Sequence, residues 1–169
     1  MTIRKLVSVG VALVAMSLAA EAKVPEGWEI EAISKSTGYS VHGQEGSKNQ
    51  FGLLKHSNTC AADELYISWV SDSDNIWPLA GKQISLAADF DGVALDIPVE
   101  VVSIRPMQGG RSFANSELLS LMANAASVNL VMASADVAQF FSVTGDRFSM
   151  QGFAQARLDA QSRCQSQSS

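Results

Sequence analysis

Residues 147–164 read RFSMQGFAQARLDAQSRC, and this stretch predicts how the chain closes. Phe148 to Met150 has the pattern of a short strand, and Gly152 supplies a pivot after it. A helix follows and ends on Cys164, one of only two cysteines in the 169 residues. Four residues fall on one narrow face of this helix, and the small ones let it lie close to a sheet: Phe153, Ala156, Ala160 and Cys164.

The first 22 residues have the features of a secretory signal peptide. Arg4 and Lys5 precede an apolar run from Leu6 to Ala20, and Ala20-Glu21-Ala22 forms a cleavage site of the A-x-A type. The run is short for a transmembrane helix, which needs roughly 20 apolar residues. We therefore expect cleavage after Ala22 and a mature chain, located in the periplasm or secreted, that has no transmembrane segment.

Export places the two cysteines in an oxidising compartment, where disulfides persist. A Cys60–Cys164 bond is the simplest interpretation, and it ties the last helix to the front half of the domain. Closing a loop of about 100 residues contributes roughly 4–5 kcal/mol in the chain-entropy model. Two unpaired thiols and an intermolecular bond are the alternatives.

The clearest local pattern in the middle of the chain is a hairpin. Apolar residues alternate from Ile84 to Phe90 and again from Val93 to Ile97, with Asp91-Gly92 between the two runs. An Asp-Gly pair in this position is typical of a type I′ turn, which needs positive φ at both residues. Pro98 lacks a backbone donor, so we expect it at a sheet edge or a bulge.

The other expected elements are mostly strands, with one further helix. We expect a helix after Asn115 or Ser116, a weak hairpin or a loop over residues 34–50, and a loop over residues 106–112. The remaining strands are expected at residues 28–33, 51–56, 64–71, 128–133 and 137–143. Because the strands do not alternate with helices, the predicted fold is mainly β (α+β). It is an antiparallel β-sandwich or a barrel-like sheet with two short helices, in one domain over 23–169 with a polar tail at 165–169.

Composition excludes several functional classes. The formal net charge is −5, and it becomes −6 once Arg4, Lys5 and Glu21 are removed with the signal peptide. There is no basic stripe, so we expect no nucleic-acid partner. With two histidines and two cysteines predicted to be bonded, a zinc site lacks ligands, and we expect no metal and no cofactor.

The C-terminal pattern resembles the end of small exported bacterial proteins of the invasion-associated locus B type. It is also similar to periplasmic accessory proteins found with type VI secretion clusters. The motifs are Phe148-Ser149-Met150 with Gly152, Cys164 with its upstream partner Cys60, the middle strand running into Asp91-Gly92, and Gly27-Trp28 near the start. The further cysteines expected of that family are missing. The resemblance implies a non-catalytic envelope protein.

Catalytic chemistry has few candidate residues. His56 lies four residues before Cys60, which permits a Cys–His nucleophile only if Cys60 is unbonded. A Ser-His-Asp triad stays open because serine is abundant, but no G-x-S-x-G elbow is present. We therefore assign no catalytic residue and expect a protein that is not an enzyme.

The expected function is protein–protein interaction as an envelope accessory factor. The candidate contact is the acidic loop with Asp72, Asp74 and Trp77, because a tryptophan beside Pro78 in a loop can anchor a partner. One alternative is an inhibitor of an exported cell-wall enzyme such as lysozyme, since an acidic protein suits a cationic target. The other is a small hydrolase that uses His56 or a serine. The oligomeric state stays open.

Overall fold

The computed structural model describes residues 27–33, 35–44, 48–71, 77–101 and 107–168. In Trp77 and residues 107–113 only the backbone is described. The predicted signal peptide, at residues 1–22, lies outside the described residues. Within them the chain forms nine strands, three α-helices and one 3₁₀ turn.

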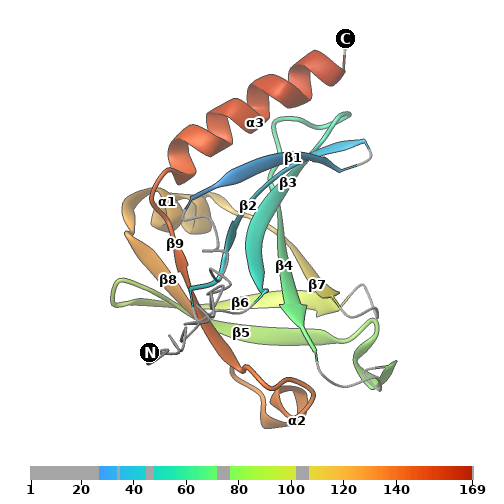
Figure 1. The fold of residues 1–169 in the computed structure, drawn as a ribbon, viewed down its shortest axis with the longest axis vertical. Coiled ribbons are helices and arrows are strands. Elements are labelled where there is room, and N and C mark those ends of the chain that lie inside the picture. Colours follow the sequence, from blue (N-terminus) through green and yellow to red (C-terminus); the bar gives the residue numbers. More distant parts are fainter. Residues whose placement is uncertain (1–26, 34, 45–47, 72–76, 102–106, 169) are drawn as a thin grey trace, which may run out of the picture.

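The strands form one antiparallel sheet in the order β1-β2-β3-β4-β7-β6-β5-β8-β9 (Figure 1). Their bounds are β1 Glu29–Ile33, β2 Ser36–His42, β3 Gln50–His56, β4 Glu64–Val70, β5 Gln83–Phe90, β6 Val93–Val101, β7 Met107–Phe113, β8 Ser127–Met132 and β9 Gly145–Ser149. The helical elements are η1 Trp77–Leu79, α1 Ser116–Asn124, α2 Ala135–Ala138 and α3 Phe153–Gln167. The predicted mainly β, antiparallel fold is confirmed.

The sheet curls on itself until β2 meets β9, which gives the barrel-like form of the prediction. Gly43 bridges Phe148, and the backbone N–H of Gln44 donates to the carbonyl of Arg147 at 2.8 Å. Asp146 is buried at this seam and accepts from Asn49 Nδ2 at 2.9 Å. A Cβ on residue 43 would clash with the carboxylate of Asp146, so the close approach of β2 and β9 requires a glycine there.

The interior of this sheet is mostly apolar, because apolar residues alternate along the strands and point inward. Its largest buried side chains include Tyr39, Phe51, Phe90, Phe148 and Leu130. The hairpin of β5 and β6 follows the predicted register, with Phe90 opposite Val93. Asp91 and Gly92 have φ values of 51° and 96°, which confirms the expected positive φ at both turn residues.

The predicted N-cap of α1, the edge position of the proline in β6 and the buried face of α3 are confirmed as well. Asn115 caps α1, its side chain accepting from the backbone N–H of Leu118 at 2.8 Å. Pro98 lies where β6 pairs with β5 alone, because the described pairing of β6 with β7 covers only Glu100 and Val101. The four predicted face residues of α3 are the buried ones of that helix: Phe153, Ala156, Ala160 and Cys164.

Four predictions of secondary structure were wrong, and α3 also continues to Gln167, past its predicted end at Cys164 and into the predicted polar tail at 165–169. Residues 107–112, expected in a loop, belong to β7, because β4 and β6 offer backbone groups on both sides of a glycine-containing segment. Residues 137–143, expected as a strand, begin within α2 and continue as turns, because β8 already pairs with β5 and β9. The closing strand is Gly145–Ser149 instead of 148–150. The described helices number three instead of two, because α2 takes the place of the expected strand.

The remaining uncertain segment, residues 34–50, contains a buried strand instead of a loop. All of β2 except His42 is buried, and it pairs with β1 on one side and β3 on the other. Neither alternative of the prediction holds in full, because the described part of the segment contains one strand whose pairing partners, β1 and β3, lie almost wholly outside residues 34–50. Because α3 packs on β1, β2 and β3 and also meets α1, the two helices cover one end of the barrel-like sheet (Figure 1).

Candidate functional site

The disulfide sets the position of α3. Cys60 and Cys164 are bonded, with their Cα atoms 5.8 Å apart and a separation of 104 in sequence. At the other end of the helix, Phe153 stacks on Tyr39 with ring centroids 6.2 Å apart and packs against Trp28 at 5.1 Å. The helix is thus fixed at both ends, and Ala156 and Ala160, the buried side chains between these ends, face the sheet in a defined register.

A polar cluster lies beneath α3 and is centred on Asp63, which directly precedes β4. The Asp63 side chain is 1% exposed, and Lys55 Nζ lies 2.7 Å from its Oδ1. The Tyr39 hydroxyl donates to the same oxygen at 2.6 Å. Arg157 of α3 donates to Oδ2 from Nε at 2.9 Å and from Nη2 at 2.8 Å. One carboxylate therefore joins β2, β3 and the closing helix, and this group is called the Asp63 cluster below.

The protonation states in this cluster follow from burial and hydrogen bonding. Burial pushes the pKa of Asp63 upward, but hydrogen bonds from Lys55, Tyr39 and Arg157 outweigh it and hold this pKa below its usual value. Burial raises the pKa of Tyr39, and the hydrogen bond to Asp63 raises it further. Asp63 is therefore ionised at neutral pH while Tyr39 keeps its proton. The Asp63 cluster holds two cations, Lys55 and Arg157, against one anion.

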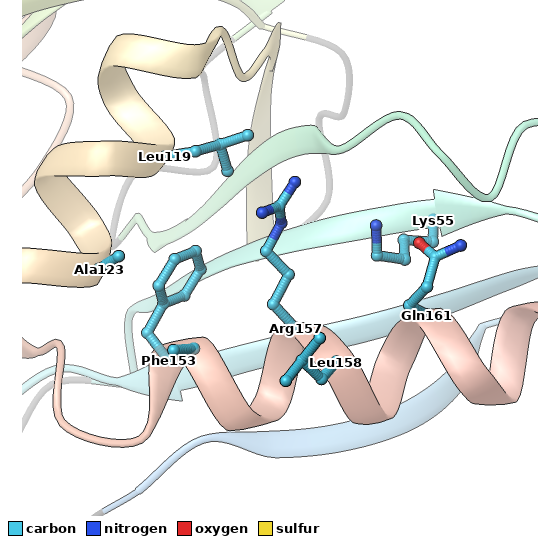
Figure 2. Close-up of a pocket in the computed structure, with 8 residues that line it drawn as sticks. Lys55, Leu119, Ala123, Phe153, Arg157, Leu158 and Gln161 are labelled. Carbon is cyan, nitrogen blue, oxygen red and sulfur yellow. The ribbon is translucent and has the colours of Figure 1, made fainter.

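A cavity of about 390 Å³ adjoins the Asp63 cluster between α1 and α3. Its apolar lining comes from both helices, and Lys55, Arg157 and Gln161 supply its polar lining. Figure 2 shows Arg157 reaching from α3 toward the space between Leu119 of α1 and Lys55 of β3. Leu158, on the same helix, also lines the cavity and is 63% exposed, more than any other large apolar side chain in the described part.

A second polar group, the Ser36 row, crosses β2, β3 and β4. Ser36 Oγ lies 2.7 Å from His56 Nδ1, and His56 Nε2 is paired with Glu64 Oε2. Ser36 stands opposite His56 in the pairing of β2 with β3. The side chains of His56 and Glu64 are 38% and 12% exposed. A serine, a histidine and a carboxylate in this order are the components of a hydrolytic triad.

The two ring nitrogens of His56 are exchanged relative to a serine-protease triad. In that arrangement Nε2 faces the serine and Nδ1 faces the acid, whereas here Nδ1 faces Ser36 and Nε2 faces Glu64. The Cys–His alternative for His56 is excluded, because Cys60 is bonded to Cys164. The Ser36 row therefore has triad components without the usual orientation of the ring.

The residues predicted as a site divide into two groups. Cys60 and Cys164 form the predicted disulfide. Of the predicted partner contact, Asp72 and Asp74 lie outside the described residues, and the backbone of Trp77 begins the short turn η1. The structure therefore brings the two cysteines together, whereas the predicted contact through the acidic loop stays a prediction.

The Asp63 cluster was not predicted from the sequence, although one signal for it was present. In Phe51-Gly52-Leu53-Leu54-Lys55, strict alternation puts Lys55 on the same face as Phe51 and Leu53. A lysine on an apolar strand face needs a buried anion as its partner. Arg157 lies 94 residues away from Asp63 in sequence, so no spacing rule connects the two.

Comparison of the chain with protein-family models, curated proteins and solved structures finds no match. Among the described residues, no group of three or more His, Cys, Asp and Glu side chains is arranged to hold a metal ion. The described helices include none that is long and apolar enough to cross a membrane. The candidate site therefore rests on its own geometry, which is that of a cavity beside a paired charge cluster.

Proposed function

We propose that this chain is a non-enzymatic protein of the bacterial envelope, exported after cleavage behind Ala22, which acts by binding a protein partner. The observation that carries the proposal is the cavity between α1 and α3, with the exposed Leu158 at a helix held by a disulfide. A fixed helix loses little conformational entropy on association, which favours its use as a binding face. The resemblance to invasion-associated locus B proteins supports the same class.

Partner capture with matched variants tests this proposal. The mature chain from Lys23 is used to capture partners from a mildly crosslinked envelope extract, and the partner is then purified and its binding is measured directly. We expect Leu158→Asp to weaken binding about tenfold or more, because an apolar side chain of this size contributes roughly 1.5–3 kcal/mol when buried. Val93→Asp is the control, since Val93 is 50% exposed on the hairpin of β5 and β6. Equal loss in both variants would contradict a binding role for the α3 face.

The loop predicted from the sequence enters the same experiment. If Trp77→Ala weakens capture while Leu158→Asp does not, the partner contacts the acidic loop instead of α3. An inhibitor of a cell-wall enzyme is one form of this proposal. It is recognised when the captured partner is such an enzyme and the purified chain lowers its activity.

A small hydrolase is the second candidate function, and the Ser36 row is the observation that favours it. A hydrolase would need Ser36 to react with a fluorophosphonate probe, and His56→Ala would need to abolish that reaction. Under the binding proposal we expect no labelled Ser36 by peptide mass spectrometry. Labelling that depends on His56 would replace the binding proposal with a catalytic one.

A further inference from the structure

The Asp63 cluster carries a surplus of positive charge at the wall of the cavity. Lys55 and Arg157 share the single carboxylate of Asp63, and Tyr39 adds a donor to it but no charge. Lys55 and Asp63 are both 1% exposed and balance each other, so the surplus charge is that of Arg157, whose side chain is 41% exposed and lines the cavity. One further negative charge in the cavity would balance the cluster.

Donor groups remain for such an anion. Lys55 Nζ has two acceptors among the described residues, Asp63 Oδ1 and the carbonyl of Cys60 at 3.1 Å, while an ammonium group carries three N–H bonds. Arg157 uses Nε and Nη2 on Asp63, and its Nη1 has no acceptor in the described part of the chain. The side-chain amide of Gln161 lines the same cavity. These donors suit a carboxylate, which accepts from both of its oxygens.

The remainder of the cavity is apolar and small. Leu119 and Ala123 of α1 face Phe153 and Leu158 of α3 across it (Figure 2). Its volume of about 390 Å³ lies near the lower end of the range of ligand sites. A single surplus charge favours a monoanion over a phosphate monoester, which carries close to two charges at neutral pH.

We infer that this cavity binds a small monocarboxylate with an aliphatic body, its carboxylate at Lys55 and Arg157 and its chain between α1 and α3. The inference rests on the proposed function only in placing binding at this face. It is tested with the purified chain alone, so its failure is distinct from a failure of partner capture.

The probe is octanoate, added below its micellar concentration and followed by calorimetry and by backbone amide shifts. We expect saturable binding, with shifts confined to α1, α3 and the end of β3. Acetate keeps the charge without the apolar body, and 1-octanol keeps the body without the charge, so each is expected to bind at least about tenfold more weakly. No saturable octanoate binding would overturn the inference.

Two pairs of variants separate the site from general effects on the fold. Arg157→Gln removes the surplus charge and should weaken octanoate about tenfold or more, without weakening 1-octanol. Its control is Arg163→Gln on the same helix, because Arg163 is exposed and its guanidinium makes only a 3.5 Å approach to the carbonyl of Ile30. Equal affinity of the Arg157 and Arg163 variants for octanoate would overturn the assigned anion site.

The second pair fills the cavity without touching the Asp63 cluster. Ala123 is exposed at the cavity wall, so Ala123→Trp is expected to occupy it and to abolish octanoate binding while the chain stays folded. Ser120→Trp places the same ring at an exposed position on α1 outside the lining residues and should bind octanoate normally. Normal binding by Ala123→Trp would overturn the location. Tighter binding of octyl phosphate, or of a peptide ending in leucine, would overturn the ligand class.

Discussion

Lys55 and His56 are neighbours in β3, yet they belong to two polar groups of different kinds. Lys55 lies on the interior face, where Asp63, Tyr39 and Arg157 complete a cluster shielded by α3. His56 lies in the Ser36 row, where its side chain is 38% exposed. Asp63 and Glu64 are adjacent in the same way, and each serves one of the two groups. We therefore expect Asp63 and Glu64, although adjacent in sequence, to contribute differently to the free energy of folding.

The difference is one of desolvation. A buried charge that loses its partner remains uncompensated, and this costs several kcal/mol. An exposed pair that is broken recovers solvation from water and contributes little. The Asp63 cluster should therefore hold α3 in place, whereas the Ser36 row should depend on the pairing of β2, β3 and β4 for its geometry.

Removal of the disulfide is expected to have the largest effect on this contrast. Replacing Cys60 and Cys164 by alanine should lower the free energy of unfolding by about 4–5 kcal/mol, because the bond closes a long loop. Denaturant unfolding measures the loss. Hydrogen exchange should show α3 amides losing protection before those of β3 and β4, since the bond holds the helix and not the strands. Equal loss of protection in α3 and in β3 would contradict this separation.

The adjacent carboxylates give the second test. Asp63→Ala should cost about 3–5 kcal/mol, because it leaves the buried Lys55 without its anion. Glu64→Ala, one residue later, should cost about 1 kcal/mol, because His56 is partly exposed and its charge can be hydrated. Denaturant unfolding of the two variants at one pH measures both losses. Similar losses in the two variants would show that burial does not separate the two groups.

Only the elements that depend on local patterns could be predicted from the sequence. Alternation and turn chemistry are local, so the Asp91-Gly92 hairpin, the Asn115 cap and the buried face of α3 were predictable. The disulfide was predictable because there were only two cysteines to pair. The strand β7 was not, since glycines favour loops unless two neighbouring strands supply partners.

The candidate site depended on contacts that sequence patterns do not encode. Arg157 meets Asp63 only because α3 lies across the end of β2 and β3, and the cavity exists only because α1 lies opposite. Lys55 within an apolar strand face was the one local sign of this arrangement. His56 was singled out from the sequence, but its partners Ser36 and Glu64 come from strands whose register the sequence pattern does not specify.

Acid should weaken the Asp63 cluster in a defined direction. The pKa of Asp63 is lowered in the folded chain, so its contribution to stability is fully present above the unfolded value of about 3.9. That contribution is lost as pH falls through the lower folded pKa, because the unfolded chain then binds the proton more readily than the folded one. Stability measured from pH 6 to pH 2 should fall more steeply in the wild type than in Asp63→Asn. Parallel curves would show that Asp63 is not held ionised by its partners.

The smallest effect is expected at Ser36. Ser36→Ala removes the hydroxyl next to His56 Nδ1 and should cost about 1 kcal/mol or less, because the ring nitrogen lies in a partly exposed side chain and can bind water instead. Tyr39→Phe removes a buried donor to Asp63 and should cost more. Thermal unfolding of the two variants measures the difference in their loss of stability. A larger loss for Ser36→Ala would mean that the Ser36 row is a second fixed element of the fold. Its geometry would then be maintained independently of strand pairing, as a catalytic group requires.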